Sequence, residues 1–239
     1  MARYIFLTLP AYGHVNPTLA LAQELVNRGQ DVIYYLPEEF QETVEATGAA
    51  FRPYESKLMK HIAKMSLTLG EESRLVLPQV LDRIRTDRPD VIVHEPVCVW
   101  TRIIIQTLSV PAISLRPTYA MNEHFNMSSL RAQLPNHRIS QMREIIAKAN
   151  ADLAEVCASY HVPPMELPSV LLYAEPLNIV FLPKAFQPAG DTFDERHLFV
   201  GPSLLPRHQA TDFPLDHLST ERPLLYISLG TIFSEAPHR

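Results

Sequence analysis

Two residues in this sequence, His14 and Glu95, have side chains suited to general acid–base chemistry and occupy matching positions along the chain. His14 follows an apolar run at residues 4–9, and Glu95 lies at the end of another at residues 91–96; both runs predict buried strands. Parallel strands meet at a common carboxyl edge, so we expect the two side chains to face each other there. A carboxylate beside an imidazole can accept its N–H and stabilise the imidazolium. Residue type alone also allows a surface turn histidine and a solvated carboxylate.

The segments around these residues alternate between strand and helix patterns. Further apolar runs at residues 31–36, 49–53 and 110–115 predict strands, and helical spacing at 15–26, 38–47 and 100–108 predicts the helices between them. Asn16 followed by Pro17 predicts the N-cap and first residue of the first helix, which places His14 in the preceding turn. The order requires right-handed crossovers. We therefore predict an α/β fold: a Rossmann-like, doubly wound, mostly parallel sheet with helices on both faces.

The rest of the chain continues this pattern with longer helices. Residues 57–87 contain two helical stripes, with a predicted break near Gly70 and a helix start or kink at Pro78. Residues 142–160 predict a long amphipathic helix, and residues 177–182 and 198–201 predict two more strands. Residues 118–136 follow no clear period, which is typical of a lid or binding loop and equally of a mobile surface loop.

The composition changes near residue 202. Residues 202–223 are rich in proline and polar side chains, and residues 224–233 then form another apolar run. We predict a domain at residues 1–201, an interdomain linker at 202–223, and the first strand of a second domain at 224–239. A strand without its sheet is prone to association. We expect residues 224–233 to lie against the first domain, to self-associate, or to remain without fixed structure.

Charge and cysteine content exclude several functions. A net charge of −5 and a pI near 6.1 disfavour a nucleic-acid or anionic-membrane surface. Cys98 and Cys157 match no metal-binding spacing, so we predict no metal site, and two cysteines suit a cytoplasmic protein. No apolar run has the length of a membrane span. Pro10, Tyr12 and His14 stand where a signal peptide would have small residues, which favours a first strand.

Three motifs resemble those of the bacterial macrolide-type UDP-glycosyltransferases. They are residues 13–17 (Gly-His-Val-Asn-Pro), 200–202 (Val-Gly-Pro) and 226–231 (Tyr-Ile-Ser-Leu-Gly-Thr). The resemblance covers essentially the whole chain, but only the amino-terminal, acceptor-binding half of the family pattern. It implies the GT-B fold, in which two Rossmann-like domains face a cleft. It also implies transfer of a hexose from a UDP-sugar, with inversion, to a hydroxyl of a hydrophobic small molecule. The UDP-sugar is a co-substrate, and no cofactor is implied.

The resemblance also suggests roles for individual residues. His14 matches the catalytic histidine, a general base that takes the proton of the acceptor hydroxyl. Glu95 occupies the place of a supporting aspartate and extends about one carbon–carbon bond further. Gly230 and Thr231 match a turn that helps to bind the nucleotide diphosphate. The acceptor-binding candidates come from the residue types instead. They are Tyr12 and Gly13 before His14, Met65 and Leu69 on a helical stripe that is typical of a core but could line a pocket, Trp100 after Glu95, and Phe125 in the irregular segment.

The family's carboxyl-terminal donor motif, a His-Cys-Gly run with an acidic sugar-binding residue, does not occur in this sequence. We therefore expect the chain to supply the acceptor pocket and the base, to bind UDP-sugar only with a donor domain, and to be inactive alone. One alternative is a non-enzymatic module, derived from such a transferase, that binds a small molecule or a partner chain. Another is an unrelated Rossmann-type nucleotide enzyme, which the lack of G-x-G-x-x-G and G-K-[ST] in the first βα turn disfavours.

Overall fold

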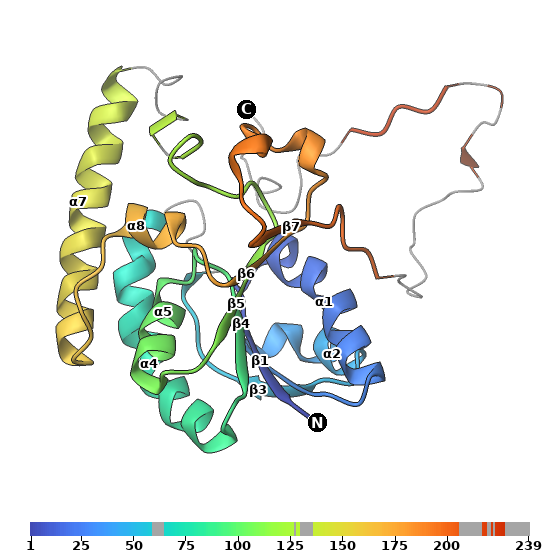
Figure 1. The fold of residues 1–239 in the computed structure, drawn as a ribbon, viewed down its shortest axis with the longest axis horizontal. Helices are drawn as coiled ribbons and strands as arrows, with labels where there is room; N and C mark the ends of the chain where they lie inside the picture. Colours follow the sequence, from blue (N-terminus) through green and yellow to red (C-terminus); the bar gives the residue numbers. More distant parts are fainter. Residues whose placement is uncertain are drawn as a thin grey trace.

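The computed structural model describes residues 1–58, 65–126, 128–129, 136–205, 217–218, 221 and 223–227, with the backbone alone at 65–68 and 136–138. Its centre is a seven-stranded sheet in the order β3-β2-β1-β4-β5-β6-β7 (Figure 1). All neighbouring strands pair in parallel. The strands are Arg3–Leu7 (β1), Asp31–Leu36 (β2), Ala50–Pro53 (β3), Val91–His94 (β4), Ala112–Arg116 (β5), Leu177–Val180 (β6) and His197–Phe199 (β7).

The strand order reverses between β1 and β4. The chain runs outward from β1 to β3 and then returns to the other side of β1, which confirms the predicted doubly wound sheet. In such sheets ligands bind beyond the carboxyl ends of the strands at this reversal. Leu7 and His94, the last residues of the two strands, lie opposite each other in register. The segments that follow β1 and β4 therefore leave the sheet side by side.

Helices cover both faces of the sheet. They are Tyr12–Asn27 (α1), Gln41–Glu45 (α2), Met65–Asp87 (α4), Val99–Leu108 (α5), Asn136–Ser159 (α7) and Leu167–Leu172 (α8), with short 3₁₀ turns at Glu38–Phe40 (η1), Lys184–Phe186 (η3) and Gly190–Thr192 (η4). Figure 1 shows α1 and α2 on one face and α4, α5, α7 and α8 on the other, with α7 outermost.

Each face of the sheet has its own apolar core. Along β1, Ile5 and Leu7 belong to the core under α4 and α5, whereas Phe6 belongs to the core under α1. This alternation is the period of two that a strand imposes on its side chains. Both cores are dominated by fully buried aliphatic and aromatic residues, so the two loops that follow β1 and β4 are anchored on a packed sheet.

The first helix begins earlier than the sequence pattern predicts. The prediction of Asn16 as N-cap is wrong, because Ala11 is the N-cap and α1 starts at Tyr12. The carbonyl of Ala11 accepts hydrogen bonds from the backbone N–H of His14 at 2.8 Å and of Val15 at 2.9 Å. Pro17 lies inside the helix, where it cannot donate to the carbonyl of Gly13. His14 therefore lies in the first turn of α1 rather than in the turn before it.

The predicted break near Gly70 and the predicted helix start at Pro78 are also wrong, because α4 is one continuous helix through both residues. The alternative prediction for Pro78, a kink, stays a prediction. Gly70 has a packing role instead. A Cβ at this position would overlap the Cβ of Asp152 on α7, so the glycine allows α4 and α7 to approach closely. Helix α7 itself confirms the long amphipathic helix predicted at residues 142–160, and it begins at Asn136.

The secondary structure of the segments between β5 and β6 and after β7 follows the predictions less closely. Residues 118–126 have no helix or strand, as their weak pattern predicts, and α8 was not predicted. At residues 223–227 the structure has no strand, and Leu224 to Ile227 are 67–80% exposed. A strand requires a hydrogen-bonded neighbour, and these residues have none in the described part of the chain. The rest of the 224–233 run and most of the linker lie outside the described residues, so the domain boundaries stay predictions.

The role of Gly70 can be tested by substitution. We expect Gly70→Ala to lower the free energy of unfolding by about 1–3 kcal/mol, because the added methyl group must displace Asp152 and separate two helices. Urea denaturation measures this loss. Gly13→Ala is the matched control, since a Cβ there meets no atom within 4 Å and alanine favours the helix. Equal losses in the two variants would contradict the packing role.

Candidate active site

The structure brings His14 and Glu95 into direct contact. Nδ1 of the His14 imidazole lies 2.6 Å from Oε2 of Glu95. The backbone N–H of Glu95 donates to the carbonyl of Leu7 at 3.2 Å, which ties the turn after β4 to the end of β1. The predicted contact between the two side chains is confirmed, and their catalytic roles stay predictions.

The two partners differ in their access to solvent. The Glu95 side chain is 1% exposed and the His14 side chain is 21% exposed, so the imidazole is the member of the pair that a ligand can reach. When Nδ1 donates its hydrogen to the carboxylate, the lone pair of the neutral ring is on Nε2. Nε2 has no hydrogen-bond partner among the residues that the structure describes. This arrangement suits a base that accepts a proton at Nε2.

The environment raises the pKa of His14. Burial lowers this pKa, but the hydrogen bond to Glu95 and its negative charge together outweigh the burial. The second carboxylate oxygen, Oε1 of Glu95, is buried and has no partner within the described ranges. The carboxylate is therefore available to stabilise the imidazolium that forms when His14 accepts a proton.

A buried hydrogen bond fixes the helix that carries His14. The hydroxyls of Thr18 on α1 and Tyr34 on β2 are 2.8 Å apart, and the Tyr34 ring stacks on Phe6 of β1 at 4.7 Å. Burial raises the pKa of Tyr34, and the charge of Glu95 adds to this effect, as expected for groups close in space. Helix α1 is therefore held against β2 and, through Tyr34, against β1.

Of the predicted acceptor-binding residues, Tyr12 and Gly13 lie beside His14 on α1. Tyr12 is 43% exposed, and its ring centroid is 5.1 Å from that of the buried Phe40. A Cβ at Gly13 would meet open space. Both positions are open to solvent, and their role in acceptor binding stays a prediction.

The other predicted ligand contacts lie elsewhere. Trp100 and Leu69 are core residues, 1% and 4% exposed, as expected for apolar residues at helical spacing, and a ligand could reach them only if the core opened. Phe125 is buried in the irregular segment, edge-on to Tyr119 at 5.7 Å. Met65 is described by its backbone alone, and Gly230 and Thr231 lie outside the described residues.

Sequence reasoning missed the polar network that supports the Glu95 turn. His94 is buried, with Nε2 3.1 Å from Oε1 of Glu175 and Nδ1 3.1 Å from the hydroxyl of Thr101. The same hydroxyl lies 2.6 Å from the carbonyl of Cys98, to which it donates, and the N–H of Cys98 donates to the carbonyl of Glu95. The alternation of side chains along β4 was a signal that His94 and Glu95 point in different directions, but nothing local marked Glu175 as a partner.

In the described part of the chain, no group of three or more His, Cys, Asp or Glu residues could hold a metal ion. None of the helices described here is long and apolar enough to cross a membrane. Cys98 and Cys157 are both buried and free.

Comparison with known proteins shows which chains this one resembles. No family model matches the chain. The NDP-glycosyltransferase YjiC of Bacillus subtilis (strain 168) is 36% identical over 244 residues, which cover 97% of this chain and 58% of that protein. The chain is a homologue of the bacterial NDP-glycosyltransferases. A second relative, the demethyllactenocin mycarosyltransferase of Streptomyces fradiae, is 33% identical over 259 residues, covering 99% of this chain and 54% of that protein.

Solved structures confirm the fold that the resemblance implies. The calicheamicin glycosyltransferase CalG4 matches with a TM-score of 0.71 and 26% identity, over 90% of this chain and 56% of CalG4. The glycotransferase of kitacinnamycin matches with a TM-score of 0.73 and 27% identity, over 89% of this chain and 54% of that protein. The sheet is thus a Rossmann-like unit of the GT-B type, and the chain spans somewhat more than half the length of these relatives.

The electrostatic coupling in this glycosyltransferase homologue can be tested by NMR titration of the His14 ring. We expect Glu95→Gln to lower the pKa of His14, because the amide removes the charge that now outweighs burial. The raised pKa also implies that the pair stabilises the fold below the ordinary histidine pKa and that this stability is lost as pH rises through the raised value. In Glu95→Gln this pH dependence should be reduced. An unchanged His14 pKa would contradict the coupling.

Proposed function

We propose that this chain is the acceptor-binding half of an inverting UDP-sugar-dependent glycosyltransferase that moves a hexose to a hydroxyl of a hydrophobic small molecule. The observation that carries the proposal is the 2.6 Å contact between His14 and the buried Glu95 at the reversal of strand order. Transfer to a hydroxyl needs a base, because a neutral hydroxyl is a weak nucleophile, and a positioned base contributes about 10²–10⁴-fold to such reactions.

In the proposed mechanism, Nε2 of His14 accepts the proton of the acceptor hydroxyl as its oxygen attacks the anomeric carbon of the sugar. The bond from that carbon to the diphosphate oxygen breaks, and UDP leaves with the electron pair. Attack from the face opposite the leaving group inverts the anomeric centre. The carboxylate of Glu95 stabilises the imidazolium during this step. Its hydrogen bond to Nδ1 of His14 also fixes the ring so that Nε2 points away from Glu95.

The surroundings of His14 support an apolar acceptor. The exposed ring of Tyr12 offers an aromatic surface, and Gly13 leaves space beside it. The names of two relatives, a demethyllactenocin mycarosyltransferase and an oleandomycin glycosyltransferase, support a natural-product acceptor such as a macrolide. Because the chain spans 58% of the YjiC relative, we propose that the UDP-sugar is held mainly by a donor domain and that the chain alone does not turn over.

A chimera tests this function. The 239-residue chain replaces the matching part of Bacillus subtilis YjiC, and product formation from UDP-glucose and a hydroxyflavone is followed by mass spectrometry. We expect product from the chimera and none from the chain alone. His14→Ala in the chimera should lower kcat/KM by about 10²–10⁴-fold, because the base is lost.

The matched control is His161→Asn, since His161 is an exposed histidine in the turn after α7 and asparagine tolerates its positive φ. It should leave the rate unchanged. Undiminished transfer by the His14→Ala chimera would refute the base assignment. Flavone binding to the chain without transfer by any chimera would instead favour a non-enzymatic binding module.

A further inference from the structure

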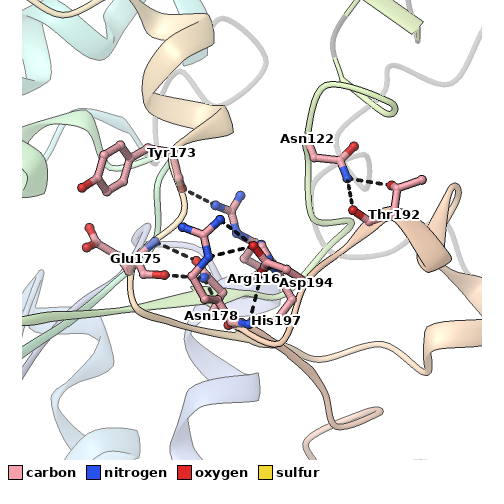
Figure 2. A network of polar contacts seen from close by, with 9 residues as sticks. Arg116, Asn122, Tyr173, Glu175, Asn178, Thr192, Asp194 and His197 are labelled. Atoms are coloured by element: carbon pink, nitrogen blue, oxygen red, sulfur yellow. Dashed lines mark hydrogen bonds and ion pairs between the residues drawn. The ribbon is translucent and has the colours of Figure 1, made fainter.

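A second polar centre surrounds Arg116 at the end of β5 (Figure 2). Arg116 contacts α8, which lies on the opposite face of the sheet from α1 and His14 (Figure 1). Arg116 is 5% exposed. Its Nη1 donates to the carbonyl of Leu171 at 3.0 Å and its Nη2 to the carbonyl of Tyr173 at 2.7 Å, both at the end of α8. These carbonyls satisfy part of the guanidinium but carry no full negative charge.

The nearby carboxylates are engaged by other cations. Glu175 lies 2.9 Å from the guanidinium of Arg102 and also contacts His94, while Asp194 pairs with Arg196 at 2.6 Å. Within the described ranges, Arg116 forms no ion pair. Burial lowers its pKa to about 10, and the charge of Glu175 only partly opposes this, so the group is still protonated at neutral pH. A buried charge without a counter-ion is costly, and a guanidinium cannot relieve the cost by losing its proton at neutral pH.

Three buried polar atoms on β5 and β7 lack a partner in the described part of the chain: Nε of Arg116, Oγ of Ser114 and Nε2 of His197. Ser114 and Arg116 share a face of β5 because they are two residues apart. Ser114 is in register with Asn178 of β6, and Asn178 is in register with His197 of β7, so this row also shares that face. Burial lowers the pKa of His197, and the positive charge of Arg116 contributes, as expected for neighbouring groups.

The donor and acceptor pattern of these atoms is specific. Nδ1 of His197 lies 3.0 Å from Oδ1 of Asp194, so Nδ1 donates there and Nε2 of the neutral ring is an acceptor. The Nε–H of Arg116 and the hydroxyl of Ser114 can donate. A hydrogenphosphate group has anionic oxygens for these donors and a P–OH hydrogen for the acceptor, whereas a carboxylate has no such hydrogen and water has no charge.

We propose that Arg116, Ser114 and His197 form a binding site for a phosphate group, supplied by free phosphate or by the terminal phosphate of a nucleotide. This goes beyond the proposed function and is separate from it, because Leu115, between Ser114 and Arg116, faces the core under α1, whereas Arg116 contacts α8 on the other face. The side chain of Arg196, which pairs with Asp194, is 49% exposed.

Thermal unfolding in phosphate tests the site, with chloride at matched ionic strength as the reference. We expect the Tm of the native chain to rise by roughly 3–5 °C per tenfold increase in phosphate above Kd. In Arg116→Gln this response should be lost. Arg28→Gln is the matched control, because Arg28 is an exposed arginine in an ion pair on α1, and it should respond as the native chain does. Acetate should raise the Tm less than phosphate.

A second variant and a second ligand complete the test. If Arg116→Gln does not fold, Ser114→Ala should weaken phosphate binding about fivefold by calorimetry, the effect of one neutral hydrogen bond. UDP identifies the source: a UDP response that Arg116→Gln abolishes supports a nucleotide phosphate, and a response to phosphate but not to UDP supports free phosphate. No phosphate response in the native chain, or an equal response in Arg116→Gln, would overturn the proposal.

Discussion

The hydrogen bond between His14 and Glu95 depends on the parallel pairing of β1 with β4. These strands are distant in sequence, yet the register places their last residues opposite each other, and the N–H of Glu95 continues the pairing with the carbonyl of Leu7. Without that pairing, the buried carboxylate of Glu95 would have no imidazole N–H from which to accept a hydrogen bond. A buried carboxylate that lost its partner would be strongly destabilising, so the geometry of the site and the stability of the sheet edge are coupled.

Two separate sets of contacts hold the partners in place. His14 is fixed from the α1 side, through the Thr18–Tyr34 hydrogen bond and the stacking of Tyr34 on Phe6. Glu95 is fixed from the α5 side, through His94, Thr101 and the carbonyl of Cys98. The two cores of the sheet thus each support one member of the pair. A site held in this way is already organised before a ligand binds, which is what electrostatic stabilisation of a charged intermediate requires.

Patterns of neighbouring residues predicted most of the strands and helices, because these elements form from residues close together in the sequence. The strands follow from apolar runs, and the meeting of His14 with Glu95 follows from the rule that parallel strands share a carboxyl edge. The start of α1 was predicted wrongly because Asn16 and Pro17 carry a start signal, whereas the actual cap is the backbone of Ala11, which has no sequence signature. Gly70 was interpreted as a helix break, because its close contact with Asp152 on α7 is a tertiary feature.

The acceptor-binding residues were harder to predict, because their exposure depends on tertiary packing. Helical spacing identifies Trp100 as buried but does not tell a core residue from a pocket residue, and its place in the core became clear only from its packing. The Arg116 centre combines residues from β5, β7 and the end of α8, and no pattern in the sequence links them.

A crystal structure with a bound acceptor would show whether His14 is the base, through the distance from the acceptor hydroxyl oxygen to Nε2 of His14. We expect a separation of about 2.6–3.2 Å, with Nδ1 still hydrogen-bonded to Glu95. An acceptor bound with its hydroxyl remote from Nε2, or a His14 ring turned away from Glu95, would contradict it.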